Sequence, residues 1–322
     1  MVRFSNSAFD KLVDCLNGKP GSIQDWTPIL KLSNEHLVTP ALNITLKDCA
    51  VPTEVREYVN FLFTLNKERN IRLRDQAIEV IEALNGVEIE PILLKGVGFL
   101  LTETTDRLGA RMLVDLDIMI PNNRVMCAIP ALGALGYSFM FPSAGHVYGV
   151  FGRDQDVGSI DLHHHPPGLS GLYEQVAGSC AVLEVNRSRS LLPSAWVRMA
   201  HIVAHDLVHH RGFETGDLQL RGLWELNHLV HTSKPVRLSE VAGLFPPGRA
   251  ESFMTTQFVA LNRLFGTEIP VELEANIIGR IQYGRRIFQA RHPVICSTAP
   301  YRLVVLISQR SYRLALRASG VD

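Results

Sequence analysis

Apolar side chains in the first quarter of the chain recur at the spacing of helices. They return every three or four positions between residues 4 and 16, and again over the long stretch 55–81. This spacing gathers them on one helix face, which is the face that packs against a core. Asn85-Gly86 follows the second stretch and is typical of a helix end. Residues 1–86 are therefore predicted to form an N-terminal helical region.

The pattern changes between residues 87 and 168, where short apolar runs replace the helical spacing. The predicted strands are residues 91–94, 113–120, 147–151 and 159–163. A helix is predicted over 121–135, because Pro121 suits the start of a helix and Gly136 ends one. Strands that alternate with helices in this way predict a small mixed sheet.

Helical spacing returns after Pro166-Pro167-Gly168 and continues to the end of the chain. The clearest predicted helices are residues 196–210, 220–230, 250–265 and 301–318. Residues 169–322 are therefore expected to form a C-terminal helical region. The predicted fold class is α+β, in which a small mixed β-sheet core at 87–168 is flanked by N- and C-terminal helical regions.

Composition and charge narrow the class of protein. The chain has 322 residues, 46% hydrophobic and 20% charged, which is typical of a globular protein with an ample core. Its 32 basic and 32 acidic side chains cancel, so the molecule as a whole lacks the basic charge of nucleic-acid binders. The exception is the stretch 280–322, with eight arginines and one acid. It is either a solvated helix face or a patch that contacts a triphosphate or an RNA.

Five scattered cysteines argue against a disulfide framework. Their number is odd and none forms a Cys-x-x-Cys pair, which also argues against zinc bound by thiolates. No stretch approaches the roughly 18 apolar residues of a membrane span, and the N-terminus lacks the apolar run of a signal peptide. We therefore expect a soluble, cytoplasmic protein with no membrane partner.

The candidate chemistry lies on the second predicted strand. Asp115 and Asp117 are two residues apart, so both side chains point to one face of an otherwise apolar strand. Asp161 adds a third acid on a later strand. These acids are either solvated on an edge strand or buried, and a buried carboxylate needs a counter-charge. A divalent cation supplies one, and Mg²⁺ suits carboxylate sites that share the ion with phosphate.

Several segments together resemble a known family. They are Leu94-Lys95-Gly96, Arg111, Asp115-Leu-Asp117-Ile, Leu135-Gly136-Tyr137 and Ile160-Asp161-Leu-His163. The combination resembles the uncharacterised nucleotidyltransferase family, which belongs to the polymerase-beta-like nucleotidyltransferase superfamily. The resemblance is close in the strand-rich middle of the chain and looser in the helical second half.

The resemblance implies a reaction and a set of catalytic acids. A nucleoside monophosphate would pass from a nucleoside triphosphate to an acceptor, and pyrophosphate would leave. Asp115, Asp117 and Asp161 would be the catalytic residues. They would also hold two Mg²⁺ ions, with Mn²⁺ as an alternative.

The resemblance also implies where the phosphates bind. The turn at Lys95-Gly96 and the side chain of Arg111 would contact them, although the wider superfamily usually has Gly-Ser or Gly-Gly at this turn. Glu225 stands where the family has an acid in its helical part, and it has no assigned role. The acceptor stays open between a small molecule, a peptide and an RNA, and an RNA would explain the basic stretch 280–322.

Histidines support a rival interpretation. His201, His205 and His209 share one face of a regular helix, and His205-Asp206 is the dipeptide of HD-type phosphohydrolases. A metal-dependent phosphohydrolase is therefore one alternative. In a transferase, His163, His205 and His209 would be candidates for the acceptor side of the cleft. A catalytically silent nucleotide-binding module is the other alternative, but the presence of all three acids favours catalysis.

Overall fold

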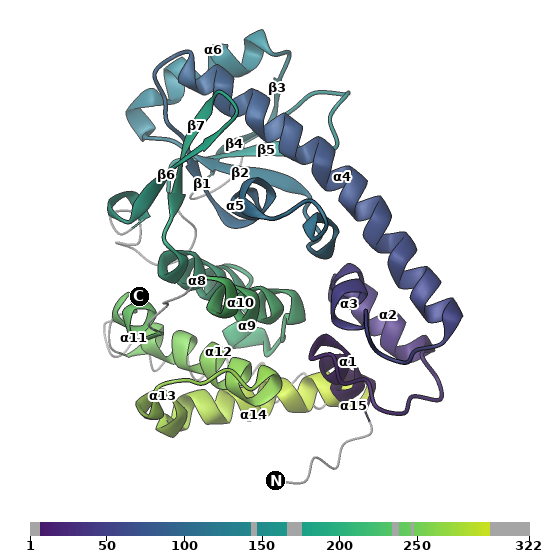
Figure 1. The fold of residues 1–322 in the computed structure, drawn as a ribbon. Helices are drawn as coiled ribbons and strands as arrows, with labels where there is room; N and C mark the ends of the chain where they lie inside the picture. Colours follow the sequence, from purple (N-terminus) through teal and green to yellow (C-terminus); the bar gives the residue numbers. More distant parts are fainter. Residues whose placement is uncertain (1–6, 143–146, 166–175, 234–237, 246–247, 297–322) are drawn as a thin grey trace.

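The computed structural model describes residues 7–142, 147–165, 176–233, 238–245 and 248–296. In this part of the chain, a seven-stranded sheet stands over a layer of helices that come from both ends of the sequence (Figure 1). The mixed sheet and its helices confirm the predicted α+β fold. Among the described helices, none has both the length and the apolar character needed to span a membrane. All five cysteines are free thiols.

The N-terminal helices are α1 (Ala8–Leu16), α2 (Thr27–Glu35), α3 (Thr39–Thr45) and α4 (Thr53–Asn85). α1 begins after Ser7, whose hydroxyl accepts a hydrogen bond from the backbone N–H of Asp10 at 3.2 Å. α4 spans 33 residues and runs from beside the sheet down to α2 and α3 (Figure 1). It ends at Asn85, as the sequence predicted, and it joins the sheet to the helical layer.

The strands are β1 (Ile92–Leu93), β2 (Asp115–Met119), β3 (Ser138–Phe141), β4 (Val147–Gly152), β5 (Ser159–His163), β6 (Cys180–Val185) and β7 (Ser188–Pro193). Their order in the sheet is β3-β4-β5-β2-β1-β7-β6. β2 pairs with β5 in parallel and with β1 in antiparallel, so the sheet is mixed. All four predicted strands form, and the one predicted at 159–163 has the same bounds as β5.

Residues 169–322 are not helical throughout, so this expectation was wrong. β6 and β7 form a hairpin that joins the sheet at β1, where Leu191 pairs with Ile92. An apolar run of six residues without glycine or proline does not distinguish a strand from a helix by its spacing. Pairing with β1, which is distant in the sequence, selects the strand here. The short strand β3 was also not predicted.

The connecting helices of the sheet region are α5 (Lys95–Thr102), η1 (Leu108–Ala110), η2 (Asn122–Arg124) and α6 (Val125–Ala134). η2 and α6 together form the helix predicted over 121–135. Gly136 follows them with a φ of +90°, a left-handed conformation that glycine adopts without steric cost. α5 begins immediately after β1, and its first turn therefore lies at the end of a sheet strand.

The C-terminal helices are α8 (Ala195–Ala204), η3 (His205–His209), α9 (Gly212–Thr215), α10 (Leu220–Thr232), α11 (Leu238–Gly243), α12 (Arg249–Phe265), α13 (Val271–Ala275), α14 (Ile277–Arg291) and α15 (Pro293–Cys296). They pack against the N-terminal helices: Asn17 Nδ2 donates to the carbonyl of Leu264 at 2.8 Å, and Arg291 Nη2 lies 2.7 Å from Asp10 Oδ1. The helix predicted at 301–318 lies outside the described residues.

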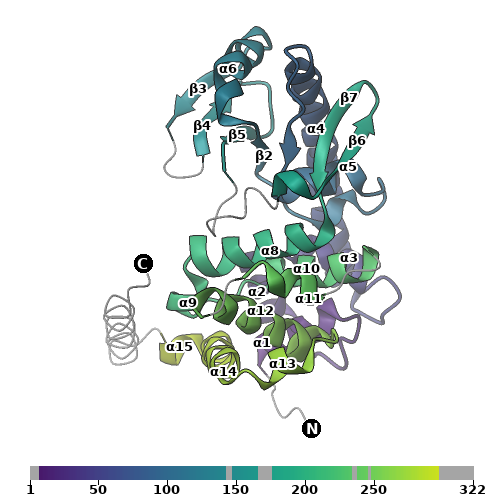
Figure 2. The ribbon, with the colours of Figure 1, turned by 90° about the vertical axis from the view of Figure 1, so that its left-hand side faces the viewer.

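The two faces of the sheet meet two different cores. Leu116 and Ile118 of β2 lie in a core shared with α4 and α6, whereas Met119 lies in the core built with the N- and C-terminal helices. Because side chains alternate along a strand, Asp115 and Asp117 share the face of Met119. The acids therefore point toward the helical layer, which lies beneath the sheet in Figure 2.

Candidate active site

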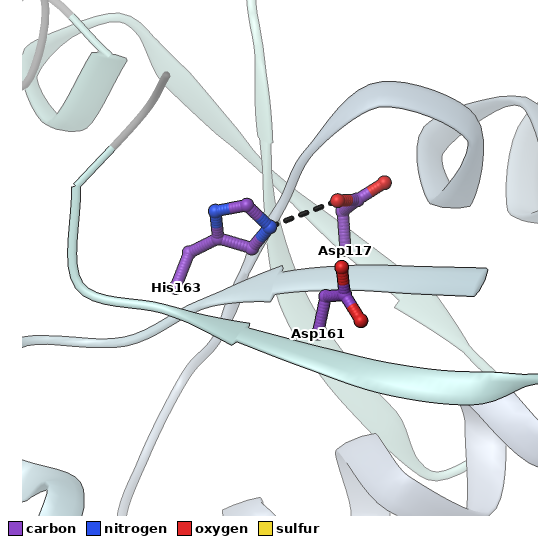
Figure 3. Close-up of side chains that lie close together, drawn as sticks. All are labelled: Asp117, Asp161 and His163. Atoms are coloured by element: carbon purple, nitrogen blue, oxygen red, sulfur yellow. Dashed lines mark hydrogen bonds and ion pairs between the residues drawn. The ribbon is translucent and has the colours of Figure 1, made fainter. Parts of the chain in front are cut away.

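Three side chains from two adjoining strands form the acid cluster of the site. Asp117 of β2 pairs in register with Asp161 of β5, so both point to the same face of the sheet. His163 follows two residues later on that face. Ligand atoms of Asp117, Asp161 and His163 all lie within 4.8 Å of one another (Figure 3). In the described ranges, no other group of three His, Cys, Asp or Glu side chains meets this condition.

Asp117 is buried, with 2% of its surface exposed, and it has two hydrogen-bond donors. Lys95 Nζ lies 2.6 Å and His163 Nε2 lies 2.8 Å from the same oxygen, Oδ1. Burial alone would raise the pKa of Asp117. The hydrogen bond from His163 and the charge of Lys95 outweigh burial and hold this pKa well below its usual range. Asp117 is therefore ionised inside the protein, and His163 carries its proton on Nε2.

The other two acids carry negative charge without such donors. Burial and the neighbouring Asp117 raise the pKa of Asp115. Burial, together with the charges of Asp117 and Asp115, raises the pKa of Asp161 to about 6. The charge of Lys95 offsets this effect only in part at both acids. The carboxylate oxygens of this face fit a divalent cation.

The turn that leads from β1 into α5 has an unusual backbone. Lys95 has a φ of +43°, which is uncommon for a residue with a side chain. At Gly96, an added Cβ would lie 2.1 Å from Leu113 Cδ2 and 2.7 Å from Arg111 Nη1. Any larger residue would therefore push Arg111 away, and glycine permits its close approach to the first turn of α5.

Arg111 is held by Glu225, which is the acid that had no assigned role. Arg111 Nη2 lies 2.8 Å from Glu225 Oε2, and the guanidinium lies 5.9 Å from the centre of the Phe99 ring. Arg111 is only 7% exposed. Its ion-pair partner therefore comes from α10, in the C-terminal helices. The ion pair thus joins the sheet region to the C-terminal helices.

A pocket of about 540 Å³ lies between α5, α8 and α10. Lys95 and Arg111 line it, so it adjoins the acid cluster through Lys95. Arg198 of α8 and Arg221 of α10 also line it, and sequence reasoning singled out neither. Each is a single arginine in an amphipathic helical pattern, which carries no signal that the two approach Arg111.

The histidines of η3 are arranged differently from the predicted helix face. η3 is a π-helix, in which the backbone N–H of His210 donates to the carbonyl of His205 at 3.0 Å. The ring centres of His205 and His210 are 4.3 Å apart, and those of His205 and His209 are 5.3 Å apart. Burial and the charge of Lys95 lower the pKa of His205 to about 2, so its ring is neutral.

The dipeptide His205-Asp206 does not form a metal site. Asp206 is buried and accepts hydrogen bonds from Gln257 Nε2 at 2.8 Å and Arg286 Nη2 at 3.3 Å. Its carboxylate thus neutralises a fully buried arginine. In the part of the chain that the structure describes, no metal-binding group of three side chains therefore lies around η3 to support the phosphohydrolase alternative.

The basic stretch 280–322 is largely structural where it is described. Arg286 pairs with Asp206, and Arg291 pairs with Asp10. Arg285 donates to the backbone carbonyls of Phe213 and Glu214. These arginines connect helices to one another, which gives the patch for RNA no support within α14. Its remaining arginines beyond residue 296 lie outside the described residues.

A mixed sheet with acids on adjoining strands, next to the start of a helix, is compatible with enzymes that transfer nucleotidyl groups. Comparison with protein families identifies the class directly: a family model described as an uncharacterised nucleotidyltransferase matches residues 22–242. The match covers well over half of the chain, so the chain belongs to this nucleotidyltransferase family. The resemblance found in the sequence is thereby confirmed.

Two further comparisons add little. The solution structure of the antibiotic-resistance factor ANT(2'')-Ia aligns with 60% of this chain and 97% of its own chain, at a TM-score of 0.39 and 15% identity. This likeness is weak, and no substrate follows from it. No curated protein matches the chain by sequence.

Proposed function

We propose that the acid cluster transfers a nucleoside monophosphate from a nucleoside triphosphate to a hydroxyl group of an acceptor. The acceptor oxygen bonds to the α-phosphorus, the bond to the β-phosphate breaks, and pyrophosphate leaves. The family supports nucleotidyl transfer in general. The observation that supports this site is the register of β2 and β5, which brings Asp117 and Asp161 to one face beside Lys95.

In this proposal, Asp115, Asp117 and Asp161 hold two divalent cations, Mg²⁺ or alternatively Mn²⁺. The ions, when bound, neutralise charge on the phosphates and make the acceptor hydroxyl more acidic. The raised pKa values of Asp115 and Asp161 support this role, because a bound cation would offset the burial and the repulsion from Asp117 that raise them. His163 positions Asp117 through its hydrogen bond and is not itself assigned to the acceptor.

The positive groups near α5 contact the phosphates in the proposed complex. These groups are the Lys95 ammonium and the backbone N–H groups of the turn at Gly96. The turn is the start of α5, and the start of a helix stabilises anions. Arg111 offers a planar set of donors, and its pairing with Glu225 fixes its orientation. We assign to Asp161 the proton that leaves the acceptor hydroxyl.

His205 is the histidine that we place on the acceptor side, because it lines the pocket between α5 and α8. His209 stacks on His205 and supports its ring. Neutral His205 donates one hydrogen bond from one ring nitrogen and accepts one at the other, which suits the positioning of a hydroxyl group.

The test is transfer of label from a nucleoside triphosphate that carries it on the α-phosphate. With Mg²⁺ and either a cellular small-molecule extract or total RNA, label should enter an acceptor while an equal amount of pyrophosphate appears. Asp117→Asn should remove this activity but leave a folded protein, whereas Asp154→Asn, at an exposed acid between β4 and β5, should not. An Asp117→Asn variant that still transfers label would contradict the assignment.

A further inference from the structure

The pocket between α5, α8 and α10 has three arginines and few available acids. Arg111, Arg198 and Arg221 all line it. Glu225 pairs with Arg111 at 2.8 Å. Of the other acids at the pocket, Asp206 pairs with the buried Arg286, Glu103 Oε2 lies 3.1 Å from His228 Nε2, and the exposed Asp217 accepts a hydrogen bond from the Thr215 hydroxyl. Among the described residues, Glu225 is thus the only one of these four acids that forms an ion pair with one of the three arginines.

Two of the guanidinium groups lie against the first turn of α5, where Gly96 and Gly98 have no side chain to keep them away. Arg111 Nη1 lies 2.7 Å from the point where a Cβ on Gly96 would stand. Arg198 Nη1 lies 3.9 Å from the corresponding point on Gly98. The N-terminal turn of a helix carries partial positive charge from its backbone N–H groups. Arg111 and Arg198 therefore both lie close to the first turn of α5.

The arginines have unused donors. Arg111 is 7% exposed, and its Nε and Nη1 atoms are buried without a hydrogen-bond partner. Arg198 Nε is also buried without a partner. Within the described ranges, no carboxylate pairs with Arg198 or Arg221. Buried guanidinium donors without acceptors are costly, so this arrangement is one that a bound anion completes.

Crowding of like charge supports the same conclusion. Burial lowers the pKa of Arg198 and Arg221, and the nearby charge of Arg111 lowers both further. Glu225 partly offsets this effect at both arginines, and Asp115 and Asp206 also do so at Arg221. An anion that contacts all three guanidinium groups would relieve their repulsion.

We propose that Arg111, Arg198 and Arg221 form a binding site for a phosphate group of a small-molecule substrate. Arginine presents a planar pair of donors that matches two phosphate oxygens. A pocket of about 540 Å³ has the size of a small-molecule site, which favours a small phosphorylated compound over a long RNA. This inference rests on the proposed function only in calling the bound compound a substrate. Phosphate binding by the three arginines requires no catalysis.

Two sources of phosphate share this chemistry. One is the β- or γ-phosphate of the nucleoside triphosphate, and the other is a phosphate on the acceptor. The first predicts that a nucleoside triphosphate competes with free phosphate for the pocket. The second predicts that both bind at the same time.

The test is calorimetric titration of the full chain with inorganic phosphate and with pyrophosphate, at low salt and without a divalent cation. Wild type should bind, and Arg198→Gln and Arg221→Gln should each weaken binding about tenfold or more, because each removes a charged hydrogen-bond donor. Arg263→Gln is the matched control: it removes an arginine from α12 that pairs with Glu274 outside the pocket. Thermal unfolding of each variant shows whether it is folded.

Absence of phosphate binding by wild type overturns the proposal. So does a wild-type affinity for phosphate in both Arg198→Gln and Arg221→Gln. Titration with phosphate in the presence of ATP and Mg²⁺ then distinguishes the two sources. Asp117→Asn separates this inference from the proposed function. Asp117 does not line the pocket, so this variant should still bind phosphate without metal. If only the proposed function fails, the variant keeps Mg²⁺-dependent ATP binding while Arg198→Gln and Arg221→Gln still weaken phosphate binding.

Discussion

One oxygen of Asp117 accepts hydrogen bonds from both Lys95 and His163, although the residue is almost completely buried. A buried carboxylate is tolerated when such donors compensate for lost hydration. Asp115 and Asp161 lack these donors, and their pKa values rise instead. The three acids therefore differ in charge behaviour: the pKa of Asp117 is lowered, whereas those of Asp115 and Asp161 are raised.

Gly96 gives the first prediction at the residue scale. Gly96→Ala should destabilise the protein by about 1–3 kcal/mol, as overpacking in a core does, because the new Cβ would lie 2.1 Å from Leu113 Cδ2. It should also lower nucleotidyl transfer, since Arg111 must move. Urea unfolding and the transfer assay measure the two effects.

Gly133→Ala in α6 is the control for this substitution. No atom lies within 4 Å of the added Cβ there. Alanine favours a helix interior over glycine, so this variant should be at least as stable as wild type. Equal stability of the Gly96 and Gly133 variants would mean that the first turn of α5 has room to spare.

His205 gives a prediction about pH. Its folded-state pKa is lowered to about 2, well below the ordinary value of 6.5. Below about pH 6.5 the unfolded chain therefore binds a proton that the folded protein does not, and stability falls as pH falls. The His205→Gln variant should show a shallower fall in the free energy of unfolding between about pH 6.5 and 4.5. Parallel curves for variant and wild type would contradict the burial of a neutral ring.

At the scale of elements, strands with their own pattern were predictable and strands selected by partners were not. β5 has the predicted bounds because Ser159–His163 alternates between apolar and polar positions and follows a loop. The hairpin of β6 and β7 was expected to be helical, since its apolar run fits either structure. Its neighbour β1 has only two residues, and β7 supplies its second partner. Such pairing is a property of the folded sheet.

The π-helical segment η3 tests the rival phosphohydrolase interpretation. Asp206→Asn should destabilise the protein by about 3–5 kcal/mol, because it leaves the buried Arg286 without a counter-charge. Asp217→Asn, at an exposed acid nearby, should change stability by only about 0.5 kcal/mol. Chemical unfolding measures both. A phosphohydrolase site would predict the opposite result for Asp206→Asn, with a stable protein that has lost metal-dependent hydrolysis.

At the scale of the whole molecule, helices from both ends of the chain form one layer beneath the acid-bearing face of the sheet (Figure 2). The ion pair between Asp10 and Arg291 joins α1 to α14 within this layer. The layer contributes Glu225, Arg198 and Arg221 to the site region. The helical regions therefore complete the pocket, while the sheet supplies the acids.

This division explains how much of the site the sequence could predict. That Asp115 and Asp117 share a face was predictable, because strand periodicity alone requires it. Asp161 joins them only through the register of β2 and β5. The partner of Arg111 was not, since Glu225 reaches it only through the packing of α10 on the sheet region. The approach of Arg198 likewise depends on helix packing. A π-helix shifts the register of the later histidines, and no short motif marks it.

We propose above all that the acid pair of Asp115 and Asp117 binds a nucleoside triphosphate together with a divalent cation. The most direct test is calorimetric titration of each nucleoside triphosphate, with and without Mg²⁺, into wild type and into the Asp115→Asn/Asp117→Asn double variant. We expect Mg²⁺ to strengthen binding by wild type, and the folded double variant to lose this Mg²⁺-dependent part of the binding. Equal binding by the double variant, or no binding by wild type, would contradict the claim that this acid pair is the nucleotide site.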